Sequence, residues 1–282
     1  MNINQLVKQI APPFMYAALD RVHRTRKYPL FGSYQDALAY CSKDGYENEV
    51  LIDVLTYKME NYLNTQKVNA DKSMTPTQSF TLLALTKVIA AHPNVNNFNI
   101  LDFGGNLGGH YYDIKRFFGK GIKLKWAVVE TPALAKAGEK FANDELQFFH
   151  SIEAATQYLG TIDLLHTSGT LQCVEKPKVY LDKLLTLNAN HILFNRMGLN
   201  RKNVEVVTIH HSKLSWNGHA GLPPNVEDRV IRYPFTFMSE KYFYDTLAQK
   251  HQIEARFSDN TGILEIPSED IIGGGLLFSR IA

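Results

Sequence analysis

Apolar and polar positions along this chain follow two different periods. In the first third, the apolar residues recur at helical spacing. The predicted helices cover residues 33–40, 47–64 and 77–91. The third helix has Thr77 as its predicted N-cap and ends before Pro93. The segment before the first strand is therefore predicted to be mainly helical.

From about residue 95, short apolar runs alternate with helical stretches. The predicted strands cover 99–103, 124–129, 146–149, 162–166 and 191–195, and the predicted helices cover 108–118, 133–142, 152–159 and 178–187. Strands that alternate with helices are typical of a parallel, doubly wound sheet. The last two predicted strands, 252–258 and 274–281, have no predicted helix between them and are expected to pair antiparallel.

These patterns divide the chain into two regions. Residues 1–94 are expected to form a helical cap over a substrate pocket, and residues 95–282 are expected to form a Rossmann-like catalytic domain. The stretch at about 199–233 is too long for a simple connection, and long loops in compact domains are often functional. It is therefore predicted to form an inserted lid.

Composition narrows the class of protein. The chain has 282 residues, of which 45% are hydrophobic and 21% charged, as expected for a soluble globular protein. A net charge of +2 does not indicate a nucleic-acid partner. Two cysteines cannot form a disulfide framework, which favours a reducing cytoplasm, and the oligomeric state stays open.

Membrane insertion is not expected, because no apolar run approaches the roughly 20 residues that a span requires. The segment 10–27, an apolar run followed by basic residues, suggests peripheral contact with an anionic membrane or a phosphorylated carrier. A solvated helix end is the favoured interpretation, because Pro12 and Pro13 interrupt the helix.

The main chemical signal is the sequence LDFGGNLGG at 101–109, between a predicted strand and a predicted helix. Glycines at this point let the backbone approach a ligand closely, and the next helix offers free N–H groups. Glu130 closes the second predicted strand, where a carboxylate can accept both hydroxyl hydrogens of a ribose. The alternatives are a tight turn without a ligand and a solvated carboxylate.

A dinucleotide or S-adenosylmethionine (SAM) would each suit such a loop. Asp102 beside the glycines favours a cationic ligand and disfavours a pyrophosphate. Asn106 occupies the second glycine position of the G-x-G-x-x-G pattern, and no Gly-Lys-Ser/Thr follows, which excludes a P-loop.

The loop resembles the first motif of the class I SAM-dependent methyltransferases, acidic-x-Gly-x-Gly-x-Gly. Asp102, Gly104 and Gly108 match it, and Asn106 replaces the middle glycine. Asn tolerates the left-handed backbone conformation that such a position requires. The resemblance implies the class I methyltransferase fold, a mostly parallel seven-stranded sheet with a C-terminal antiparallel hairpin.

Most of the chain is also similar to a group of bacterial methyltransferases known largely from sequence. These have an LDFGG-x-x-G segment, a W-x-VVE strand and a YP-x-x-F-x-S-E-x-x-F stretch, which appear here at 101–108, 126–130 and 233–243. The sequence FGSY at 31–34, together with Gly45 and Tyr46, is similar to the N-terminal region of that group.

The resemblance also implies roles for individual residues. Gly104, Gly105 and Gly108 would line the methionine and ribose portions of SAM, Glu130 would hold the ribose hydroxyls, and Asp102 would orient the cationic tail. His150 and Ser151, in the loop after the third strand, would contact the adenine, although a plain surface turn fits equally well.

Residues after the fourth and fifth strands are expected to face the methyl acceptor. Thr167, Ser168, Arg196 and Trp216 are the predicted substrate-binding residues, with Arg196 suited to an anionic group. A plain surface salt bridge is the favoured alternative for Arg196.

A proton acceptor is needed if the acceptor is a hydroxyl or a protonated amine, and histidine is the natural candidate. The candidates are His110, His166, His210 and His211. No metal site is expected, because His210 and His211 lack further ligands at suitable spacing.

The sequence therefore predicts a SAM-dependent methyltransferase that acts on a small molecule or a saccharide. Two alternatives remain. One is a protein of the same fold that binds SAM without catalysis, and the other is a nicotinamide-dependent oxidoreductase.

Overall fold

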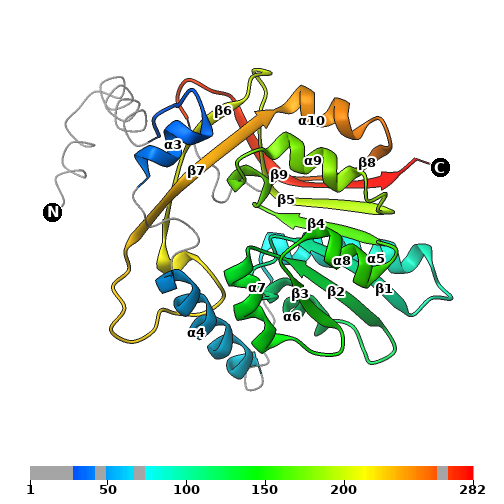
Figure 1. Ribbon diagram of the computed structural model, residues 1–282. Coiled ribbons are helices and arrows are strands. Elements are labelled where there is room, and N and C mark those ends of the chain that lie inside the picture. The colour runs from blue at the N-terminus through cyan, green and yellow to red at the C-terminus, as the bar shows by residue number, and fades with distance from the viewer. Residues whose placement is uncertain (1–27, 42–48, 67–73, 259–265, 282) are drawn as a thin grey trace, which may run out of the picture.

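The computed structural model describes residues 28–41, 49–66, 74–258 and 266–281, and within them a nine-stranded sheet carries helices on both faces (Figure 1). The strands are β1 (Asn97–Phe103), β2 (Lys123–Val129), β3 (Leu146–Phe149), β4 (Leu164–Ser168), β5 (His191–Asn200), β6 (Val206–Lys213), β7 (Val230–Ser239), β8 (His251–Ser258) and β9 (Ile271–Arg280). The helices are α3 (Tyr34–Tyr40), α4 (Glu49–Gln66), α5 (Pro76–Ala91), α6 (Gly109–Lys115), α7 (Pro132–Gly138), α8 (Ile152–Leu159), α9 (Pro177–Leu185) and α10 (Glu240–Leu247). Short 3-10 turns are η1 (Glu139–Phe141), η2 (Leu171–Cys173) and η3 (Leu214–Trp216). The segment 10–27 and the residues Gly45 and Tyr46 lie outside the described residues.

The strand order confirms the predicted doubly wound sheet. Strands β3, β2, β1, β4 and β5 are neighbours in that order and run parallel. On the far side of β5, β9 pairs antiparallel with β5, and β8 pairs antiparallel with β9. The C-terminal antiparallel pair is therefore present, but the sheet has nine strands and not the predicted seven, because β6 and β7 were not predicted.

The two faces of the sheet have separate apolar cores because side chains alternate along each strand. Leu101 and Phe103 of β1 pack beneath α8, α9 and α10. Phe98 and Ile100 point to the opposite face and pack beneath α5 and α6. Asp102 has the parity of Ile100, so its carboxylate lies on the α5–α6 face.

Helix α5 packs against the sheet and is not part of a separate helical cap. Its residues Ala84, Leu85 and Val88 share the core that contains Ile100. The boundary predicted near residue 94 therefore does not separate two cores. The N-cap is Thr75 and not the predicted Thr77, and it forms a capping box with Gln78.

The segment predicted as a lid contains most of a β-hairpin, in which the whole of β6 pairs antiparallel with residues Val230 to Phe237 of β7. The end of β7 also pairs in parallel with Leu199 and Asn200, so the hairpin extends the sheet beyond the end of β4. Figure 1 shows the hairpin running from the sheet towards α4, with α3 beside β7. The prediction of a lid was wrong in this respect, because the β-branched run VVTI and the aromatic run YPFTF were not identified as paired strands.

None of the helices in the described part of the chain combines the length and the apolar character that a membrane span requires.

Candidate functional site

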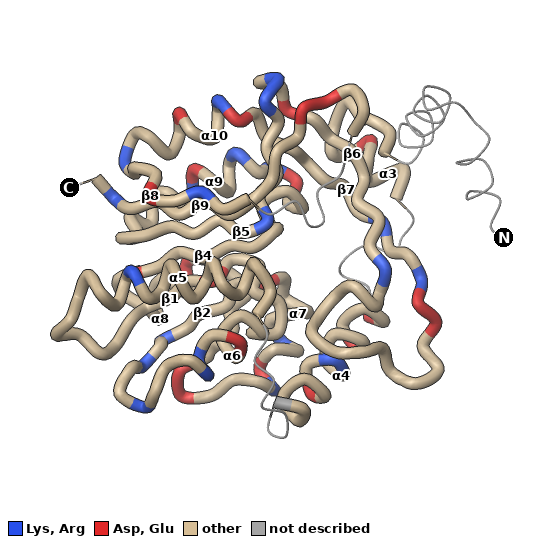
Figure 2. Tube along the Cα trace, turned by 180° about the vertical axis from the view of Figure 1, so that it is seen from behind, with Lys and Arg blue, Asp and Glu red and all other residues tan. Residues whose placement is uncertain are grey.

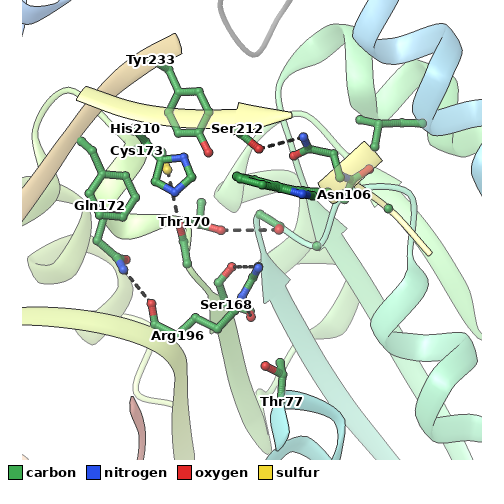
Figure 3. Close-up of a pocket in the computed structure, with 18 of the residues that line it drawn as sticks. Thr77, Asn106, Ser168, Thr170, Gln172, Cys173, Arg196, His210, Ser212 and Tyr233 are labelled. Carbon is green, nitrogen blue, oxygen red and sulfur yellow. Dashed lines mark hydrogen bonds between the residues drawn. The ribbon is translucent and has the colours of Figure 1, made fainter. Parts of the chain in front are cut away.

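A cavity of about 2080 Å³ lies at the carboxyl edge of the parallel strands. The glycine loop after β1, the ends of β2 and β4, the bulged part of β5 and the β6–β7 hairpin contribute to its lining, with Tyr62 of α4. Figure 3 shows that these walls bring residues far apart in sequence together, including Asn106, Ser168 and Tyr233. In open α/β sheets, this edge is where ligands bind.

The glycine loop uses three left-handed backbone positions. Gly104, Asn106 and Gly108 have φ values of 76°, 53° and 81°. The conformation expected of Asn106 is thus confirmed, and its Oδ1 accepts a hydrogen bond from the N–H of Leu107 at 2.8 Å. A Cβ atom at Gly104 would lie 2.0 Å from Oγ1 of Thr170. Gly104, Gly105 and Asn106 line the cavity, whereas Gly108 caps α6.

Glu130 lies directly after β2 and faces the glycine loop. Its Oε1 accepts a hydrogen bond from the N–H of Asn106 at 2.9 Å, and its Oε2 accepts one from the N–H of Thr131 at 3.1 Å. Burial raises its pKa to about 7, because these two hydrogen bonds offset the loss of solvation only partly. Glu130 also lines the cavity, so this residue lies beside a space that a ligand can enter.

Asp102 lies beneath the loop and not in the cavity. Its carboxylate is fully buried, and it accepts hydrogen bonds from Nδ1 of His166 at 2.8 Å, from Nδ1 of His110 at 3.0 Å and from Nε1 of Trp126 at 3.1 Å. Burial acts to raise the pKa of Asp102, but the two histidines outweigh it and hold the pKa well below its usual range. The expectation that Asp102 contacts a cationic ligand does not fit this placement, because its oxygens are already bonded to protein groups.

His166 is also fully buried and does not line the cavity. Nδ2 of Asn195 lies 3.3 Å from its Nε2 and donates to Oγ1 of Thr81 at 2.9 Å. Burial lowers the pKa of His166 in spite of the nearby carboxylate. A neutral His166 that donates from Nδ1 to Asp102 fits these contacts. Its expected role as a proton acceptor for substrate does not fit, because the ring has no exposed surface.

His110 links this network to the cavity. Burial acts to lower its pKa, but the carboxylate of Asp102 outweighs it and raises the pKa above its usual value. The side chain is 17% exposed and lines the cavity. The buried Asp102 thus favours the cationic form of an imidazole at the cavity surface beside the glycine loop.

Asp102, His110 and His166 offer metal-ligating atoms that lie within 4.8 Å of one another. Both Nδ1 atoms are within hydrogen-bond distance of the carboxylate, and the indole of Trp126 uses a further acceptor position. Protein donors therefore already satisfy the carboxylate, and we interpret the cluster as a hydrogen-bond network.

The remaining predicted cofactor and substrate residues divide into two groups. His150 is exposed, Ser151 caps α8 through a hydrogen bond from the N–H of Ala154, and Thr167 is buried within β4. None of these three lines the cavity, so the expected adenine contact of His150 and Ser151 has no support from the geometry. Ser168 and Arg196 do line the cavity, at the ends of β4 and in the bulge of β5.

His210, His211 and Trp216 belong to the hairpin, and all three line the cavity. The ring of His210 stacks on Tyr233 with centroids 5.1 Å apart and contacts Phe235 at 5.2 Å. Trp216 is 66% exposed. The hairpin therefore provides an aromatic wall with two imidazoles.

A further cluster in the cavity was not predicted from the sequence. Asp113 of α6 accepts hydrogen bonds from the hydroxyl of Tyr62 and from Nε2 of His219, the latter at 2.9 Å. The rings of Tyr62 and His219 lie 4.6 Å apart, and a Cβ atom at Gly109 would lie 2.2 Å from His219. The cluster joins α4, α6 and the turn between β6 and β7. The three residues of the cluster come from distant parts of the chain, so no sequence motif contains them. The long inserted segment was the one sequence signal that pointed to this region.

Comparison with known proteins gives fold neighbours only at low similarity. No family model and no curated protein matches the sequence. Among solved structures, the chain is similar to an S-adenosylmethionine-dependent methyltransferase from Clostridium acetobutylicum, with 10% identity, 79% of this chain and 98% of the other covered, and a TM-score of 0.42. The CcbJ methyltransferase from Streptomyces caelestis has 11% identity over 76% of this chain and all of its own, with a TM-score of 0.45. Magnesium protoporphyrin IX methyltransferase from Synechocystis, solved with bound SAM, has 12% identity over 84% and 100%, with a TM-score of 0.41. Scores this low establish no function for this chain.

Proposed function

We propose that this protein binds SAM in the cavity and transfers its methyl group to a small-molecule or saccharide acceptor. The observation that carries the proposal is the relation between Glu130 and the glycine loop. A carboxylate at the end of β2 faces a glycine-rich turn at the end of β1, and both line the same cavity. This pairing suits an adenosine, whose ribose presents two hydroxyl donors.

The residues present fit SAM better than a dinucleotide. Glu130 would accept hydrogen bonds from the ribose hydroxyls, and the backbone of Gly104 and Gly105 would lie along the ligand. His110, whose pKa the carboxylate of Asp102 raises, would pair in its protonated form with the carboxylate of the methionine portion. A pyrophosphate is less suited to this loop, because Asn106 occupies the second glycine position of the G-x-G-x-x-G pattern, where the backbone would approach the pyrophosphate. When bound, SAM supplies an electrophilic methyl group on a sulfonium.

The chain would contribute mainly position and proton transfer. In-line transfer requires the acceptor atom to be held close to the methyl carbon. His210 and His211 are the available proton acceptors of the hairpin wall, since both line the cavity. His166 would act only through Asp102, as a positioning residue.

Isothermal titration with SAM, S-adenosylhomocysteine and NADH tests the proposal. We expect micromolar binding of the first two, loss of at least about tenfold in Glu130→Ala, and no binding of NADH. Glu139→Ala is the matched control, because Glu139 is exposed and its ion-pair partner among the described residues is the exposed Lys136. Failure of both SAM and S-adenosylhomocysteine to bind would reject the proposal.

Catalysis is tested separately from binding. Incubation with methyl-labelled SAM and a panel of small acceptors should give labelled product in the wild type. Tight binding of S-adenosylhomocysteine without any turnover would favour the SAM-binding protein that lacks catalysis.

A further inference from the structure

Arg196 has an unusual backbone conformation at the cavity wall. Its φ is 50°, in the left-handed region, and it lies where the pairing of β5 with β9 shifts register between Phe194 and Met197. This conformation is strained for any residue that has a Cβ atom, so the surrounding structure must hold it. The bulge turns Arg196 out of the strand, and its side chain is exposed in the cavity.

Several neighbours hold this arginine in place. Its Nε donates to Oγ of Ser168 at 3.0 Å, and its Nη2 donates to the carbonyl oxygen of Ser168 at 2.9 Å. Nε2 of the buried Gln172 donates to the carbonyl oxygen of Arg196 at 2.7 Å. Gly169, at φ 70°, lies directly beside the guanidinium, since a Cβ there would be in van der Waals contact with Cζ of Arg196 at 3.4 Å. Figure 3 shows the guanidinium beside Ser168 at the floor of the pocket.

This guanidinium is oriented but not neutralised. Among the described residues, no carboxylate lies within ion-pair distance of Arg196. Two of its five N–H groups are used by Ser168, so Nη1 and one hydrogen of Nη2 stay available as a planar fork. That fork matches the two oxygens of a carboxylate.

The rest of the cavity adds basic residues and an aromatic wall. Arg232 and Lys213 also line it, Lys213 lies 3.9 Å from a carboxylate oxygen of Asp228, and Figure 2 shows Lys and Arg positions along the β6–β7 hairpin. Across the pocket from Arg196, Figure 3 shows His210 and Tyr233, whose rings stack at an interplanar angle of 25°. Such a wall packs against the face of a planar ring.

We propose that the methyl acceptor is a ring compound that carries a carboxylate. Arg196 binds the carboxylate through its free fork, and the ring lies against the His210–Tyr233 wall. This inference rests on the proposed function and specifies its acceptor. The compound is either an aromatic acid or a sugar acid, since the rings of both present a flat apolar face to such a wall.

Two pairs of probes test the proposal, benzoate against benzamide and glucuronate against glucuronamide. Each pair has the same ring and differs in the charge of one group. Binding is measured by titration calorimetry with and without S-adenosylhomocysteine. We expect the acid of at least one pair to bind at least about tenfold more tightly than its amide, and the pair that responds identifies the ring.

Variants assign the effect to Arg196. Arg196→Gln should remove the preference for the acid. Arg196→Lys should keep only part of this preference, because lysine has charge but no planar fork. Arg201→Gln is the control with the same charge change, since Arg201 is exposed and pairs with Asp270 outside the cavity lining. Near-ultraviolet circular dichroism checks that each variant is folded.

Three outcomes would overturn the proposal. The first is equal binding of acid and amide in both pairs, and the second is an unchanged preference in Arg196→Gln. The third is no binding of either acid at 10 mM, roughly the limit for a contact worth about 3 kcal/mol. The titration with S-adenosylhomocysteine reports on the cofactor independently. A protein that prefers the acid but does not bind S-adenosylhomocysteine retains the anion site and loses the methyltransferase assignment.

Discussion

The carboxylate of Asp102 accepts a hydrogen bond from Nδ1 of His166 at 2.8 Å, and neither side chain has any exposed surface. The two residues are paired in register on the adjacent parallel strands β1 and β4. The sheet therefore brings together a carboxylate before the glycine loop and a histidine of the next strand in space. Their contact with His110 extends this buried network to the cavity.

Asp102→Asn should destabilise the protein by about 3 kcal/mol or more, because an amide of the same size cannot accept all three hydrogen bonds and leaves His110 without its counter-charge. Urea unfolding measures this loss. The pKa of His110, followed by NMR titration, should fall in the same variant. Asp144→Asn, at an exposed position, should change stability by about 0.5 kcal/mol or less. An unchanged His110 pKa would contradict the assignment of charge in the network.

Binding of S-adenosylhomocysteine should strengthen as the pH rises from 6 to 8. The ligand requires the ionised form of Glu130, whose pKa burial raises to about 7, so a proton must leave before binding at the lower pH. The expected change in affinity over this range is about tenfold. In Glu130→Gln, the affinity should be lower and should lose this pH dependence. Calorimetric titration at three pH values is sufficient, and a dependence that survives in Glu130→Gln would assign it to another group.

Gly104→Ala should abolish cofactor binding and destabilise the protein by more than about 2 kcal/mol. The new Cβ combines a positive φ of 76° with overlap against the side chain of Thr170. Gly160→Ala separates the two effects, because Gly160 has a φ of 78° and no atom of the described residues lies within 4 Å of its Cβ position. Thermal unfolding should show a smaller loss in that control, about 1–3 kcal/mol from backbone strain alone. Equal losses in the two variants would show that backbone strain alone accounts for the effect.

The cluster of Asp113, Tyr62 and His219 should stabilise the protein at neutral pH and not in acid. Burial acts to raise the pKa of Asp113, but hydrogen bonds and the charge of His219, with Tyr62, lower it below the ordinary value of 3.8. The stabilisation is therefore fully present above pH 3.8 and is lost as the pH falls through the lower folded-state pKa.

Asp113→Asn should accordingly cost about 2 kcal/mol at pH 7 and progressively less in acid. Urea unfolding over a pH series measures the difference from the wild type. Tyr62→Phe, which removes one hydrogen bond and no charge, should cost about 1 kcal/mol. A cost of Asp113→Asn that does not shrink in acid would mean that packing, and not the ionised carboxylate, is responsible.

The sequence alone determined the elements whose signals are local. The alternation of apolar strands and helices predicted the parallel sheet, and the left-handed position of Asn106 followed from its place in the glycine loop. Glu130 was placed at the loop because successive parallel strands end at the same edge of a sheet. Each of these features depends on a short stretch of chain and on the rules of βαβ connection.

Which side chains reach the cavity depends on the tertiary structure and was not predictable from the sequence. Strand parity and the packing of α5 and α6 bury Asp102 and His166, although both stand next to residues that line the cavity. The pairing of Tyr62, Asp113 and His219 depends on where α4 and the hairpin turn meet α6, which no short-range pattern encodes. Burial and long-range contact are properties of the packed chain, and they set the charge and exposure on which the chemistry of each residue depends.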